Sequence, residues 1–191
     1  MKFKIVSLFV LCAILISCGT SRQGGKKQRK GTKAQVVLTP EQQRKYDYFF
    51  LEASRLKMKD DYSAAFDLLQ HCLTINPNAS SALYEISQYY MYLKQVPQGQ
   101  AALEKAVEND PDNYWYSQGL ASLYQQQNEM QKATNLLESM ATRFSDRMDP
   151  LYSLLDIYNR LEEYDNVITT LNRLEEKMGK NEQLSMEKFR I

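Results

Sequence analysis

The chain has 191 residues, of which 43% are hydrophobic and 25% are charged, a composition typical of a protein that folds. Seven glycines and five prolines are too few for the many turns of a β-sandwich, and one histidine and three cysteines argue against a clustered metal site or a multi-disulfide scaffold. The net charge of +1 hides a split, because residues 18–33 contain six bases and every acid lies beyond them.

The first 17 residues have the pattern of a secretion signal. Two lysines precede an apolar run over residues 5–16, which is too short to span a bilayer but fits the apolar core of a signal peptide. The run ends in Leu15-Ile16-Ser17-Cys18, which resembles the lipobox of bacterial lipoproteins. This resemblance implies that residues 1–17 are removed and that Cys18 is acylated. An ordinary secretory signal with a chance cysteine is the alternative.

The residues after Cys18 bear on where such a lipoprotein would lie. In lipoproteins of this kind Asp after the cysteine marks inner-membrane retention, and an acidic stretch marks surface export in Bacteroidetes-like bacteria. Here Gly19 and a basic arm follow instead. We therefore expect a lipid-anchored protein on the periplasmic face of the outer membrane. Residues 18–38 would be a flexible tether, either a solvated spacer or a second contact with anionic lipid. The arm has no aromatic residues among its bases, so no nucleic-acid partner is expected.

From residue 46 the sequence repeats every 34 residues, in the units 46–79, 80–113, 114–147 and 148–181 and a partial unit 182–191. Seven residues into the units stand Ala53, Ser87, Ala121 and Leu155, and nineteen residues in stand Ala65, Gly99, Ala133 and Val167. Ten residues in stand Leu56, Tyr90, Tyr124 and Tyr158. A fixed period with two apolar helical patterns in each unit predicts a stack of helix hairpins.

This pattern resembles the tetratricopeptide repeat (TPR) family over residues 46–191. The resemblance implies an all-α fold, an α-solenoid of antiparallel helix hairpins with four repeats and the start of a fifth. Small residues such as Ala53 and Ala65 would let the two helices of a hairpin approach closely. Thr39-Pro40-Glu41-Gln42 has the residues of a helix start. We expect helices over 40–58, 62–75, 80–93, 97–109, 113–126, 130–144, 149–161 and 164–178.

Two features depart from the family pattern. Unit four has Leu155, Val167 and Leu174 where the family prefers small residues, so its hairpin should be wider or stack differently. Residues 182–191 begin a first helix without a second helix to cover it. We therefore expect that the chain is part of a longer protein or that another chain covers this end, with a disordered tail as the alternative.

No group of residues indicates catalysis. His71 and Cys72 are adjacent on an expected helix, where neighbouring side chains point about 100° apart and cannot act as a base and nucleophile pair. Cys72 is expected in the core and His71 at the surface or at the edge of the groove. There is no Gly-rich phosphate loop and no serine elbow. We expect a protein that is not an enzyme and that has no metal or cofactor.

Function is then expected on a surface. In the TPR family the concave groove is formed by side chains one, four, eight and eleven residues into each unit. Among the sixteen residues so mapped, the candidates for binding a partner are Phe50, Lys57, Tyr84, Gln88, Met91, Trp115, Gln118, Gln125, Tyr152, Asp156 and Asn159. Aromatic rings beside amides suit an extended peptide or a partner helix.

One alternative for these aromatic residues remains open. Tyr84 and Tyr152 could instead pack between repeats. Because Lys57 is the only base among the sixteen positions, a strongly acidic peptide tail is not expected as the ligand. The leading hypothesis is a membrane-anchored scaffold that binds a protein or peptide in the cell envelope. The alternatives are the regulatory region of a longer enzyme and a lipoprotein that binds glycans.

Overall fold

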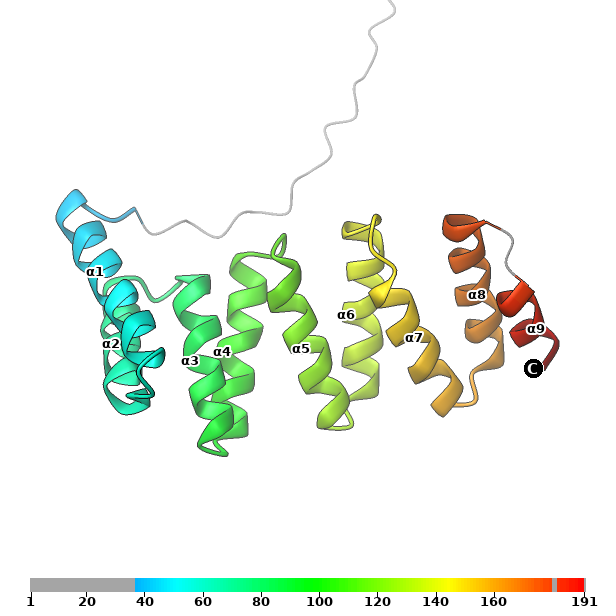
Figure 1. The fold of residues 1–191 in the computed structure, drawn as a ribbon, viewed down its shortest axis with the longest axis horizontal. Coiled ribbons are helices and arrows are strands. Elements are labelled where there is room, and N and C mark those ends of the chain that lie inside the picture. The colour runs from blue at the N-terminus through cyan, green and yellow to red at the C-terminus, as the bar shows by residue number, and fades with distance from the viewer. Residues whose placement is uncertain (1–36, 180–181, 191) are drawn as a thin grey trace, which may run out of the picture. The chain divides into compact units, whose positions relative to one another are not determined.

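The computed structural model describes residues 37–179 and 182–190. These residues form nine α-helices and no strand, and the helices follow one another in a single row in chain order (Figure 1). They are α1 (Pro40–Lys57), α2 (Tyr62–Ile75), α3 (Ser80–Tyr92), α4 (Val96–Asn109), α5 (Tyr114–Gln126), α6 (Met130–Arg143), α7 (Asp149–Arg160), α8 (Tyr164–Met178) and α9 (Glu182–Arg190). The expected all-α solenoid of helix hairpins is confirmed, and each of the first eight helices begins and ends within one residue of its expected bounds.

The start of α1 is fixed by its own side chains. The backbone N–H of Gln42 donates to Thr39 Oγ1 at 3.2 Å, and the backbone N–H of Thr39 donates to Gln42 Oε1 at 2.9 Å. Pro40 is the first helical residue, where the missing N–H has no partner to lose. This reciprocal capping box is the arrangement that the sequence predicts.

The turn inside each hairpin has the same backbone conformation. One non-glycine residue in each turn has a φ of 58–61°, and these residues are 34 apart: Asp60, Lys94, Asn128 and Glu162. In the first turn the N–H of Asp60 donates to the carbonyl of Lys57, and the N–H of Asp61 donates to that of Leu56. The other three turns repeat both bonds. This is the Schellman motif that ends a helix, here built without glycine.

The small residues expected inside the hairpins are buried. Ala53, Ala65, Ala121 and Ala133 are all buried where the two helices of a hairpin meet. One apolar cluster belongs mainly to units one and two and the other to units three and four. Because α4 contributes Leu103 to one cluster and other residues to the second, the two clusters adjoin along this helix.

The last two complete hairpins are packed less closely through their backbones than the first two. Fully buried Met140 and Leu174 occupy the position that Cys72 and Ala106 hold in units one and two. A longer side chain at this position keeps the helices of a hairpin further apart. The widening expected in unit four is therefore present, but it extends to unit three, which the sequence analysis did not anticipate.

The partial fifth unit is helical over residues 182–190, so the disordered alternative is wrong for these residues. Leu184 is buried, and Lys188 Nζ lies 2.6 Å from Glu175 Oε2 of α8. In the described part of the chain no helix combines the length and the apolar character needed to cross a bilayer. The lipobox and the expected acylation site at Cys18 lie outside the described residues.

Candidate functional site

The groove positions predicted from the repeat lie on the first helix of each unit, α1, α3, α5 and α7, and we call this surface the first-helix face. Contacts between successive units already occupy several of its side chains. Lys57 of α1 places its Nζ 2.7 Å from Glu85 Oε2 of α3, and this hydrogen bond raises the pKa of the lysine. The one base among the sixteen groove positions is therefore paired within the molecule.

Two predicted aromatic residues pack largely within the array. The ring of Tyr84 stacks on Tyr116 of the next unit, with 4.8 Å between centroids, and is half-buried. Phe50 stacks on Tyr46 one turn away, with 5.9 Å between centroids. Tyr84 therefore packs between repeats, which was the alternative to a partner-binding role.

Trp115 and Tyr152 are more accessible. Trp115 is 64% exposed and Tyr152 is 46% exposed, although the Tyr152 hydroxyl contacts Met178 Sδ at 3.3 Å. Among the remaining predicted residues, Gln88, Asp156 and Asn159 are exposed and Met91, Gln118 and Gln125 are half-buried. Gln118 accepts a hydrogen bond from the hydroxyl of Tyr114 at 3.1 Å. The side chains that remain accessible to a partner are thus concentrated in units three and four.

The structure adds one residue that the sequence analysis missed. Arg147, in the loop before α7, has its guanidinium carbon 3.8 Å from the ring centroid of Tyr114 and 5.4 Å from that of Trp115. Its Nε lies 4.0 Å from Asp149 Oδ2, which also accepts a hydrogen bond from Tyr114 at 3.3 Å. A cation thus stands beside the most exposed aromatic ring of this face. Arg147 is the last residue of its unit, outside the four groove positions, so the repeat pattern carried no signal for it.

Comparison with known proteins agrees with this geometry. The family model described as "Tetratricopeptide repeat" matches residues 80–113, the exact bounds of the second unit. The described residues form a tetratricopeptide-repeat array. No curated protein matches the sequence.

Solved TPR structures resemble this array in fold. A crystal structure of MamA has a TM-score of 0.59 and 19% identity, over 71% of this chain and 74% of that chain. A tetratricopeptide repeat protein from Parabacteroides merdae has a TM-score of 0.62 and 16% identity, over 75% of this chain and 57% of that one. YrrB is described as a TPR protein with an unusual peptide-binding site. It has a TM-score of 0.56 and 13% identity, over 76% of this chain and 75% of that one. At these identities the likeness is one of fold.

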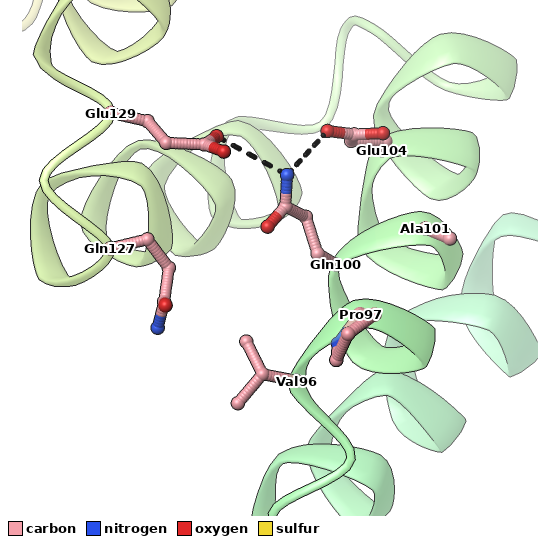
Figure 2. A pocket seen from close by; sticks show the side chains of 7 residues that line it. All are labelled: Val96, Pro97, Gln100, Ala101, Glu104, Gln127 and Glu129. Carbon is pink, nitrogen blue, oxygen red and sulfur yellow. Dashed lines mark hydrogen bonds between the residues drawn. The ribbon is translucent and has the colours of Figure 1, made fainter.

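The TPR array also has a hollow of about 410 Å³ between α4 and the turn that joins α5 to α6 (Figure 2). The side-chain amide of Gln100 donates to Glu104 Oε1 at 3.0 Å and to Glu129 Oε2 at 3.2 Å. The hydroxyl of Tyr124 donates to the same oxygen of Glu104 at 2.9 Å. Burial, and then this hydrogen bond, raise the pKa of Tyr124. These polar groups hydrogen-bond to one another across two units. We therefore interpret the hollow as a structural contact between repeats, not as a binding site.

Cys72 and His71 occupy the places that the sequence predicts. Cys72 is fully buried, with its Sγ 3.8 Å from the carbonyl oxygen of Tyr46, and burial raises the pKa of its thiol to about 11. His71 is exposed, and its ring centroid lies 5.5 Å from that of Phe49. A thiol held protonated in the core is a poor nucleophile. In residues 37–179 and 182–190 no three His, Cys, Asp or Glu side chains are grouped as metal ligands.

Proposed function

We propose that this chain is a membrane-anchored TPR scaffold that binds a protein or peptide partner along the first-helix face. The observation that carries the proposal is Trp115, a large aromatic side chain that remains 64% exposed beside the guanidinium of Arg147. Tryptophan and arginine are the residues most often responsible for binding energy at protein interfaces. A protein-interaction role also agrees with the TPR fold.

The partner would contact the half of the face that belongs to units three and four. There Trp115 and Tyr152 offer exposed aromatic surface, while Asp156 and Asn159 offer exposed hydrogen-bonding groups. Aromatic rings supply contact area at a low cost in conformational entropy, and carboxylate or amide groups can satisfy the backbone of an extended peptide. In units one and two Lys57 and Tyr84 are engaged within the array.

A photo-crosslinking amino acid placed on the full-length chain tests the face directly. A probe at Asn159, at the end of α7, should capture the partner, whereas a probe at exposed Thr142 of α6 should not. Replacing Trp115 and Tyr152 together by alanine should abolish capture while helicity by circular dichroism is unchanged. Capture of equal strength from both probe positions, or capture that survives the double substitution, would place the interface elsewhere.

The anchor is the second part of the proposal. It rests on the order of basic start, apolar run, Ser17 and Cys18, and the absence of Asp after Cys18 favours the outer membrane. Acylation at Cys18 would hold the array on the periplasmic face. A metabolic fatty-acid label should be incorporated into the wild-type chain and lost in Cys18→Ser, which should accumulate as the unprocessed precursor. Unchanged labelling of that variant would reject the anchor without affecting the partner-binding proposal.

A further inference from the structure

The helix α1 stands at one end of the row (Figure 1). One side of it, distinct from the first-helix face, has exposed side chains. Tyr46 and Ala53 are buried, whereas Tyr48 and Leu51 are 64% and 69% exposed. Tyr48 and Leu51 are three residues apart, so their side chains are neighbours on the helix surface. We define the outer face of α1 by the residues Glu41, Arg44, Tyr48, Leu51, Glu52 and Arg55.

The charges on this outer face are arranged antisymmetrically about Tyr48. Glu41 lies seven residues before it and Arg55 seven residues after it, while Arg44 lies four residues before it and Glu52 four after. Because each residue turns an α-helix by about 100°, all four lie within about 40° of the direction in which Tyr48 projects. Each acid on one side of Tyr48 is therefore matched by a base at the same separation on the other side.

With a two-fold axis at Tyr48, the charges of one copy would face opposite charges of a second copy. The axis would place Glu41 opposite Arg55 of a second copy and Arg44 opposite Glu52 of that copy, each pair occurring twice. Tyr48 would meet its own equivalent at the axis. We propose that two copies of this chain associate through the outer faces of their α1 helices, antiparallel and related by a two-fold axis at Tyr48.

The ion pairs inside one chain are compatible with this arrangement. Within α1, exposed Glu41 pairs with exposed Lys45 at 2.8 Å, and half-buried Glu52 pairs with exposed Arg55. Arg44 has no ion-pair partner in the described part of the chain, so association would give it one. Ion pairs at a helix surface are individually weak, which lets them re-form across an interface.

The arrangement leaves the proposed partner surface free. Phe50 and Lys57 of the first-helix face project about 160–180° away from Tyr48 around α1. A pair of chains would therefore present two first-helix faces on one assembly, which strengthens binding to a partner that carries two sites. The self-association does not depend on the partner-binding proposal, because the two surfaces share no residue.

Charge reversal tests the axis because residues 44 and 52 are two turns apart and do not meet within one helix. In sedimentation of the full chain in detergent at about 100 μM, the wild type should contain dimers. Arg44→Glu places like charges opposite each other twice and should weaken dimerisation roughly ten- to thirtyfold, and adding Glu52→Arg should restore it. Arg160→Glu, the same charge change at an exposed residue of α7, should have no effect.

Disulfide trapping tests the same axis independently. Two antiparallel helices about 10 Å apart, each with its Cα atoms about 2.3 Å from its axis, bring facing Cα atoms to about 5 Å, within the range of a disulfide. Tyr48→Cys should therefore form a crosslinked dimer, and Gln70→Cys on the exposed side of α2 should not. A monomeric wild type, an unchanged dimer in Arg44→Glu, or no rescue by the double reversal would overturn the proposal. Equal crosslinking at positions 48 and 70 would do the same.

Discussion

Two glycines of the described residues lie inside helices, and replacing each by alanine should change stability in opposite directions. Alanine is favoured over glycine within a helix by up to about 1 kcal/mol. A Cβ added at Gly119 of α5 would lie 3.6 Å from Tyr84 Cε2 and 3.8 Å from Leu103 Cδ2, which is ordinary van der Waals contact. Gly119→Ala should therefore raise the free energy of unfolding by about 1 kcal/mol.

Gly99 of α4 has the same helical setting but no room. A Cβ there would lie 2.7 Å from Met91 Sδ and 3.1 Å from the backbone carbonyl oxygen of Ser87 in α3. The methionine can move, but the carbonyl can move only with its helix, so the α3–α4 hairpin must open. Overpacking of this kind costs about 1–3 kcal/mol, which exceeds the gain in helix propensity. Gly99→Ala should lower the free energy of unfolding by about 1 kcal/mol.

Urea unfolding followed by circular dichroism at 222 nm, with both variants compared at equal concentration, measures the difference. The two substitutions add the same methyl group to helices of neighbouring repeats, so each serves as the control for the other. The expected separation is about 2 kcal/mol. The reasoning about close packing at the hairpin would be refuted if Gly99→Ala were as stable as Gly119→Ala, or more stable.

Three further predictions use the same unfolding measurement. Leu137→Ala should cost about 2–5 kcal/mol, since Leu137 is fully buried and its removal leaves a cavity; a loss below 1 kcal/mol would count against the repeat register. Lys94→Gly should gain about 0.5–1 kcal/mol by relieving the positive φ, and Asn128→Gly should gain less because asparagine tolerates that conformation; equal gains would contradict this. Because the pKa of Cys72 is raised to about 11 in the folded chain, the unfolded thiol loses its proton first, so stability should fall between about pH 9 and pH 11; a fall of the same size in Cys72→Ala would assign it to other groups.

The sequence was sufficient for the fold because the features that determine it are local and periodic. The reciprocal cap at Thr39 and Gln42 involves residues three apart, and Pro77 and Pro111 lie two residues beyond the ends of α2 and α4. Small residues such as Ala53 recur with the period, so their burial follows from the repeat itself. Each of these inferences needs only neighbouring residues or a comparison of one unit with the next.

The turn conformations and the width of the third hairpin depend on contacts that the 34-residue period does not predict. The left-handed turn residues are not glycines, so the sequence at Lys94 and Glu162 did not predict a positive φ. The hydrogen bonds at the helix end impose this conformation. The widening of the third hairpin follows from Met140, one long residue in an otherwise regular unit. Its effect depends on how much space the facing helix leaves, which the sequence of a single unit does not contain.

The charge of the first-helix face shows the same limit. Lys57 is the only base at the groove positions, and Glu85, which does not belong to the groove set, neutralises it. Arg147, also outside that set, brings a guanidinium to Trp115. The repeat therefore predicts which side chains line the face, while neighbours outside the pattern determine its charge. A partner bound as proposed would meet a cation at Trp115 and the exposed carboxylate of Asp156 one unit further along. Its own charges would need the opposite order, an acidic group near unit three and a basic group near unit four.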